Sequence, residues 1–177
     1  LNICSTKLFD EVYVVTNSDE IINILKEFNI KFLKSKKHHN TGTDRIAEFS
    51  NKFKSDIIIN VQGDEPFVLK EDLLRIINKF KSDIQNKINV ISLMTKLTSY
   101  EEISNPNNVK VVVDKNNNSL LFSRSIIPFN RLENDINYYK HIGIYAFRNS
   151  FLNKFKKYKQ TNFCLLYTSD AADDTSG

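Results

Sequence analysis

Residues 56–66, DIIINVQGDEP, constrain the fold more than any other stretch of this chain. They begin as a continuous apolar run rich in β-branched residues, which is the pattern of a strand buried on both faces. Gly63 and Pro66 end this strand, and the carboxylates of Asp64 and Glu65 follow its carboxyl end. Ligands of open α/β sheets bind outside the carboxyl ends of the strands. The sequence therefore predicts a functional site at this point.

Strands and amphipathic helices alternate through the first hundred residues. Short β-branched runs predict strands over residues 12–16, 30–33, 56–62 and 89–97. Helices are predicted after the capping residues at 17–19, after 41–45, and over 70–81. Their expected apolar faces are Ile21, Ile24, Leu25 and Phe28, then Ile46, Phe49 and Phe53, then Leu73, Leu74, Ile77 and Phe80. This order predicts an α/β fold with a parallel sheet and helices on both faces.

The second half of the chain changes the sheet. After a break at residues 105–108, residues 109–114 and 119–123 are predicted to form a β-hairpin, which makes the sheet mixed but mostly parallel. A further strand is expected over 140–147 and a helix over 150–158.

Composition removes several classes of function. The chain has 177 residues, which fits one domain, and a net charge of +4 without a basic run, so nucleic-acid binding ranks last among the candidates. Cys4 and Cys164 have no spacing typical of zinc. Four glycines supply neither a Walker loop nor GxGxxG. No apolar run approaches the roughly 18 residues of a membrane span, and the cytoplasm is the expected location.

Each candidate residue also has an ordinary structural explanation. Asp64 could hold Mg²⁺, and a strand-end turn with solvated acids explains it equally well. Arg45 and Arg124 could bind an anion, although an exposed charge is favoured for either one alone. His141 and Tyr145 lie four residues apart on an expected strand and therefore face the same side, where a core histidine is the usual explanation.

The combination of motifs changes these odds. The stretches TGTDR, NVQGDEP, EEISNPNNVKVVVD, LLFSRSIIPFNR and YKHIGIYAFR occur in this order. Together they closely resemble the 3-deoxy-manno-octulosonate cytidylyltransferases (CMP-Kdo synthetases), over nearly all of residues 1–157. The resemblance implies a Rossmann-like nucleotidyltransferase fold. Sialic acid cytidylyltransferases share this fold but differ at the QGDEP block.

The resemblance also implies a reaction and a set of residues. CTP and Kdo would give CMP-Kdo and pyrophosphate for lipopolysaccharide synthesis, with Mg²⁺ as cofactor and a homodimer at full length. Asp64 resembles the family's catalytic, Mg²⁺-binding aspartate, and Gln62 a sugar-contacting glutamine. The residues expected around the acidic sugar are Arg45, Arg124, His141 and Tyr145, and those expected near the nucleotide are Thr41 and Gly42.

The chain departs from the family at both ends. The family's amino-terminal triphosphate loop is absent, as is the segment with a second metal-binding aspartate. Residues 164–177 resemble a translated sequencing adapter, so a partial cytidylyltransferase domain over 1–163 and a non-native tail over 164–177 are expected. These residues alone are predicted to be inactive. The alternatives are a cytidylyltransferase for another acidic sugar, such as sialic acid, and a non-catalytic nucleotide- or sugar-binding module.

Overall fold

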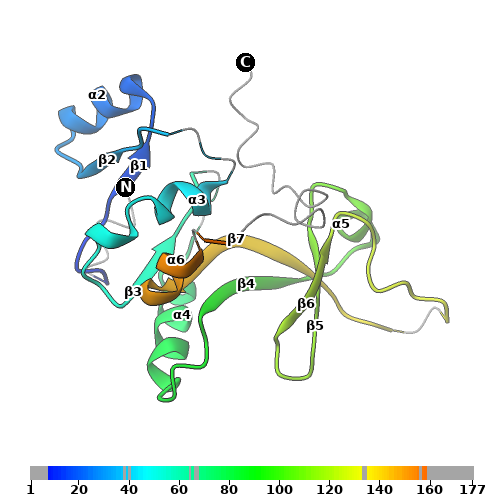
Figure 1. Cartoon of the computed structure of the whole chain (residues 1–177). Coiled ribbons are helices and arrows are strands. Elements are labelled where there is room, and N and C mark those ends of the chain that lie inside the picture. Colours follow the sequence, from blue (N-terminus) through cyan, green and yellow to red (C-terminus); the bar gives the residue numbers. More distant parts are fainter. Residues whose placement is uncertain are drawn as a thin grey trace. The chain divides into compact units, whose positions relative to one another are not determined.

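The computed structural model describes residues 8–37, 39, 41–63, 65, 68–132, 135–155 and 157–158 (Figure 1). The chain divides into two compact units. The first unit contains the described residues up to Ile91 together with those from Ala146 onward, and the second contains Ser92–Tyr145. Strands β4 (Val90–Leu97) and β7 (Tyr138–Arg148) each contribute residues to both units.

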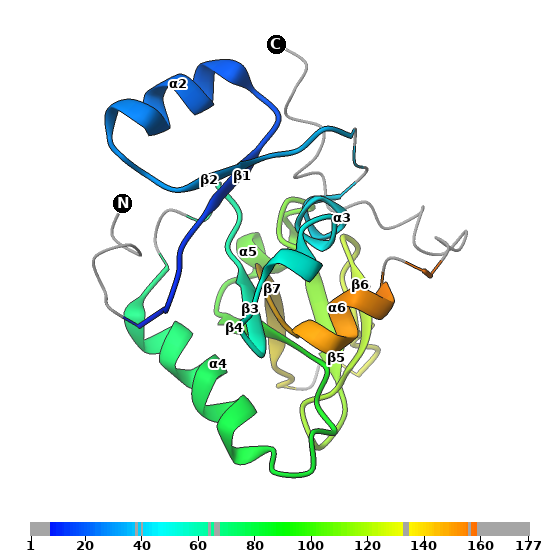
Figure 2. The ribbon, with the colours of Figure 1, turned by 60° about the vertical axis from the view of Figure 1, so that its left-hand side comes forward.

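A small parallel sheet opens the first unit. Strands β1 (Val14–Thr16) and β2 (Phe32–Lys34) pair in parallel, with Val14 opposite Phe32, and helix α2 (Asp19–Glu27) connects them. Figures 1 and 2 both show α2 beside these two strands. The Ser18 hydroxyl accepts a hydrogen bond from the Ile21 N–H at 3.3 Å, so the predicted helix start is confirmed.

The predicted apolar face of α2 is wrong in three positions. Ile22 and Leu25 are the buried residues of this helix, whereas Ile21, Ile24 and Phe28 are 44%, 54% and 64% exposed. The helix carries two adjacent apolar stripes, and residues three apart lie on one stripe. The described part of the chain covers only the stripe with Ile22 and Leu25. Sequence periodicity gave no basis for choosing between the two stripes.

The helix after Thr41 is shorter than expected. Helix α3 spans Gly42–Ala47, and a separate 3₁₀ turn, η1, spans Ser50–Lys52. The fully buried Ser50 hydroxyl lies 2.8 Å from the Ala47 carbonyl and 2.8 Å from Asn153 Oδ1 of helix α6 (Asn149–Phe155). Such side-chain bonds to the preceding turn compete with regular helix formation, so the chain tightens here.

Strand β3 (Ile57–Asn60) is less buried than its apolar run predicts. Ile57, Ile58 and Ile59 are only half-buried, and Asn60 is the buried residue. Burial on both faces was therefore the wrong expectation, because the described part of the chain covers these isoleucines incompletely. Among the described residues the second sheet has the order β3-β7-β5-β6, with β4 also paired to β7.

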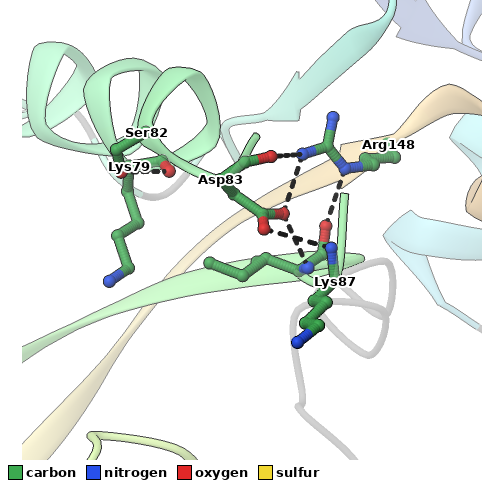
Figure 3. A network of polar contacts seen from close by, with 6 residues as sticks. Lys79, Ser82, Asp83, Lys87 and Arg148 are labelled. Atoms are coloured by element: carbon green, nitrogen blue, oxygen red, sulfur yellow. Dashed lines mark hydrogen bonds and ion pairs between the residues drawn. The ribbon is translucent and has the colours of Figure 1, made fainter. Parts of the chain in front are cut away.

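Helix α4 (Lys70–Ser82) is fixed at its carboxyl end by a polar network, drawn in Figure 3. Arg148 Nη2 donates to Asp83 Oδ2 at 2.9 Å, and Arg148 Nε donates to the Ile88 carbonyl at 2.9 Å. Asp83 also accepts from the Lys87 and Ile88 N–H groups. These bonds, led by the one from Ile88, lower the pKa of Asp83. On the helix Leu73, Ile76 and Phe80 are buried, while the predicted Leu74 and Ile77 are only half-buried.

The second unit contains the predicted hairpin. Strands β5 (Lys110–Val113) and β6 (Ser119–Ser123) pair antiparallel, and β5 also pairs antiparallel with β7. Helix α5 (Tyr100–Ser104) precedes them and begins with a capping box between Ser99 and Glu102. The fold is therefore mixed α/β with both strand orientations, as predicted. None of the helices in the described ranges is long and apolar enough to cross a membrane.

Candidate active site

The first residue of α3 and the end of β3 lie side by side in the first unit. A Cβ atom placed on Gly42 would lie 3.8 Å from Asn60 Nδ2 and 4.0 Å from Gln62 Nε2. A larger side chain at Gly42 would therefore contact both polar side chains. The structure thus brings together Gly42 and Gln62, two of the residues that the sequence predicted for one site.

Thr41 and Arg45 are placed by α3 itself. The Thr41 hydroxyl donates to Asp44 Oδ2 at 2.8 Å and accepts from the Asp44 N–H at 3.1 Å. This bonding confirms Thr41 as the helix cap and uses its only hydroxyl hydrogen within the protein. Arg45 is half-buried on the same short helix. A role for Thr41 in nucleotide binding stays a prediction, as does the sugar role of Arg45.

Asn60 is a candidate that the sequence analysis missed. It is 5% exposed, and its Nδ2 atom has no hydrogen-bond partner among the residues that the structure describes. Buried polar groups are nearly always hydrogen-bonded, and leaving one unpaired costs roughly 1–3 kcal/mol. Because this amide lies beside Gly42 and Gln62, it is suited to meet a ligand there. The only signal in the sequence was a polar residue ending an apolar strand.

The metal role predicted for Asp64 lies outside the described residues. Next to it, the Glu65 N–H donates to the Gln62 carbonyl at 3.2 Å, which closes a turn directly after β3. The described ranges contain no group of three or more His, Cys, Asp or Glu side chains that could hold a metal ion. Mg²⁺ needs fewer protein ligands, because one or two carboxylates and the substrate phosphates complete its shell. The carboxylate of Asp64 is a chemically suitable ligand for Mg²⁺, and its metal role stays a prediction.

Glu48 holds the segment that leads to Thr41. Ser35 Oγ donates to Glu48 Oε2 at 2.6 Å, and His39 Nε2 lies 2.8 Å from the same oxygen. These contacts, the Ser35 bond first, lower the pKa of Glu48. Ser35 is buried, so the carboxylate anchors both ends of residues 35–39 inside the unit. Sequence reasoning assigned Glu48 no role, because its partners Ser35 and His39 lie 13 and 9 positions away in the chain.

His141 and Tyr145 share one face of β7 in the second unit, as predicted. Their ring centroids are 5.1 Å apart, and the Phe122 ring packs edge-on against His141 at 5.0 Å. His141 is 8% exposed, and this burial lowers its pKa from 6.5 to about 4. The imidazole is therefore neutral near pH 7. It can donate or accept a hydrogen bond, but it carries no charge for an ion pair.

Arg124 and Lys110 hold consecutive carbonyls in the same unit. Arg124 Nη1 donates to the Pro106 carbonyl at 2.9 Å, and Lys110 Nζ donates to the Asn105 carbonyl at 3.0 Å. Lys110 is fully buried, and its pKa is lowered first by that burial and then by the charge of Arg124. Lys110 was not predicted, because its motif reads simply as a strand.

The predicted residues thus fall into two groups. Thr41, Gly42, Arg45 and Gln62 belong to the first unit, whereas Arg124, His141 and Tyr145 belong to the second. Within the first group the structure brings Gly42 to Gln62, and within the second it brings His141 to Tyr145. A hollow of about 270 Å³ in the first unit, formed by residues 9–12, 30 and 31, includes none of them.

Comparison with known proteins shows which family the chain resembles. The family model described as "Cytidylyltransferase" matches residues 2–171, which passes the expected boundary at 163. The chain is 50% identical over 153 residues to 3-deoxy-manno-octulosonate cytidylyltransferase of Flavobacterium johnsoniae, covering 85% of the chain and 62% of that protein. It is 46% identical over 152 residues to the protein of the same name in Christiangramia forsetii, covering 85% and 61%.

A solved structure is similar in fold as well. It is described as CMP:2-keto-3-deoxy-manno-octonic acid synthetase complexed with CTP, with a TM-score of 0.81 and 31% identity. The match covers 90% of this chain and 65% of that one, which confirms the predicted nucleotidyltransferase fold. The chain spans about three fifths of the length of the curated relatives named above. On the family match and these identities, this chain belongs to the cytidylyltransferase family.

Proposed function

We propose that the full-length protein transfers CMP from CTP to 3-deoxy-manno-octulosonate, releasing pyrophosphate, as a step toward lipopolysaccharide. One observation carries the proposal: 50% identity over 153 residues to a relative of that name. The anomeric hydroxyl oxygen of the sugar attacks the α-phosphorus of CTP, the bond to the β-phosphate oxygen breaks, and the hydroxyl proton is released. We further propose that the protein works in the cytoplasm as a homodimer.

The protein's contribution to such a transfer is mainly positioning and charge neutralisation. Gln62 and the neutral His141 offer uncharged hydrogen-bonding groups to sugar hydroxyls, and Arg45 and Arg124 offer guanidinium groups to a carboxylate. Near Gly42, the unpaired Asn60 amide offers the ligand a hydrogen-bond donor. This donor is neutral, so no charged side chain has to lose its hydration there. Asp64 is the residue proposed to hold Mg²⁺, which when bound would neutralise charge on the triphosphate.

The test is pyrophosphate release by the full-length protein with CTP and Mg²⁺. We expect turnover with Kdo, none with sialic acid, and a loss of at least about a hundredfold for Asp64→Asn, because one metal-held charge contributes several kcal/mol to such a transfer. Glu71→Gln, on the exposed side of α4, serves as the control. Turnover with sialic acid but not Kdo would replace the substrate assignment, and turnover with neither would favour a binding module.

The 177 residues by themselves are proposed to be inactive, since the resemblance places a triphosphate loop and a second metal ligand outside them. Pyrophosphate release by this chain alone, above that of its Asp64→Asn variant, would refute this.

A further inference from the structure

Ser92 forms a compact hydrogen-bonding centre beside Nε2 of the His141 ring. Its Oγ atom lies 2.7 Å from His141 Nε2, 3.1 Å from the Ile142 carbonyl oxygen and 3.0 Å from the Ile144 carbonyl oxygen. All four residues belong to the second unit, and Ser92 is half-buried. One side chain of β4 therefore contacts three polar groups of β7, namely one ring nitrogen and two carbonyl oxygens.

A serine hydroxyl has a single hydrogen, and this limits the possible bonding. If that hydrogen pointed at His141 Nε2, the Ser92 oxygen would present lone pairs to two carbonyl oxygens at 3.0–3.1 Å, which is repulsive. If it points between the two carbonyls, both contacts become favourable. The hydroxyl oxygen then accepts a hydrogen bond, and the proton must be on Nε2 of the imidazole.

The protonation state of the other ring nitrogen, Nδ1, then follows by elimination. A neutral imidazole with its hydrogen on Nε2 has an unprotonated Nδ1, which can only accept a hydrogen bond. The contacts of the described residues include no bond to Nδ1, while Phe122 and Tyr145 fix the ring plane. The ring is thus held ready to accept a hydrogen bond from a ligand O–H or N–H group.

We propose that Ser92 is a positioning residue, which fixes the Nε2–H tautomer of His141 so that Nδ1 accepts a hydrogen bond from a hydroxyl of the sugar substrate. The tautomer part stands by itself, whereas the identity of the ligand rests on the proposed function. The proposal excludes a role for His141 as a cationic contact to the sugar carboxylate. It also makes the ligand a hydroxyl donor, as a polyhydroxylated acid sugar is.

Nuclear magnetic resonance of the full-length protein, labelled with ¹⁵N at histidine, tests the tautomer directly. Long-range correlations near pH 7 should show His141 with its hydrogen on Nε2. Ser92→Ala should allow the Nδ1–H form to appear, while Ser92→Thr, which keeps the hydroxyl, should preserve the wild-type form. An Nδ1–H form in the wild type, or an unchanged tautomer in Ser92→Ala, would overturn the proposal. The wild-type spectrum decides even if the alanine variant does not fold.

Kinetics then separate the positioning role from a purely structural one. Ser92→Ala should raise the KM for Kdo about five- to tenfold, the equivalent of one hydrogen bond, and leave the KM for CTP unchanged. Ser104→Ala, an exposed serine that also bonds a backbone carbonyl in this unit, should change neither constant. Equal rises in both KM values would overturn the positioning role. Absence of turnover with Kdo in the wild type would instead count against the proposed function, and the tautomer would still be measured.

Discussion

The titration of His141 gives a quantitative prediction about stability. The ring is 8% exposed and its pKa is lowered from 6.5 to about 4 by burial. Because the folded state favours the neutral ring, the unfolded chain binds the proton more readily. The stabilising contribution is therefore complete above about pH 6.5 and is lost as the pH falls from there toward 4.

The size of this loss follows from the two pKa values. One pKa unit corresponds to about 1.4 kcal/mol, so protonation of the buried ring costs about 3 kcal/mol in total. Between pH 7.5 and pH 5 the free energy of unfolding should fall by about 2 kcal/mol from this group alone. Carboxyls with lowered pKa values, including Glu48 and Asp83, lose their contributions only below their ordinary values of 4.5 and 3.8.

Urea unfolding of the full-length protein at steps of half a pH unit measures the effect. His141→Gln removes the titrating group but keeps a side chain that can bond Ser92, so its curve should be flatter over this range. The variant loses ring packing against Phe122 and Tyr145, which lowers its stability by a similar amount at every pH. Parallel curves for the wild type and His141→Gln would refute the reasoning, as would a measured His141 pKa near 6.5.

Three further predictions concern the first unit. Arg148→Met should lower the melting temperature by at least about 5 °C, because it leaves the Asp83 carboxylate buried without its cation. Arg75→Met is the control, because the Arg75 side chain is 79% exposed. Equal changes in melting temperature for the two variants would contradict the argument. Asn60→Leu should leave the free energy of unfolding unchanged or raise it by up to about 2 kcal/mol, since it removes an unpaired donor. The same variant should bind CTP or Kdo more weakly in calorimetry. A destabilised variant with normal binding would be inconsistent with a ligand contact. Glu48→Gln should accelerate hydrogen exchange at residues 35–39, where Ser35 and His39 lose a charged partner, and unchanged exchange would argue against the anchor.

The sequence predicted the fold best where local signals were strong. The cap residues Ser18 and Thr41 marked two helix starts correctly, and the turn before Ser119 marked the hairpin. It failed where burial depends on neighbouring elements. The sequence alone could not show which stripe of α2 is covered, or that Ser50, which bonds the turn before it, would also contact Asn153, a residue 103 positions away.

The candidate site divides in the same way. The motif NVQGDEP and the spacing of His141 and Tyr145 were visible as patterns of residue types, because catalysis requires particular functional groups near a strand end. Whether a side chain finds a partner depends on atoms distant in sequence. The unpaired Asn60 amide, the buried Lys110 and the Glu48 anchor are therefore visible only in three dimensions. So is the neutral His141, whose tautomer is set by a serine 49 residues earlier in the chain.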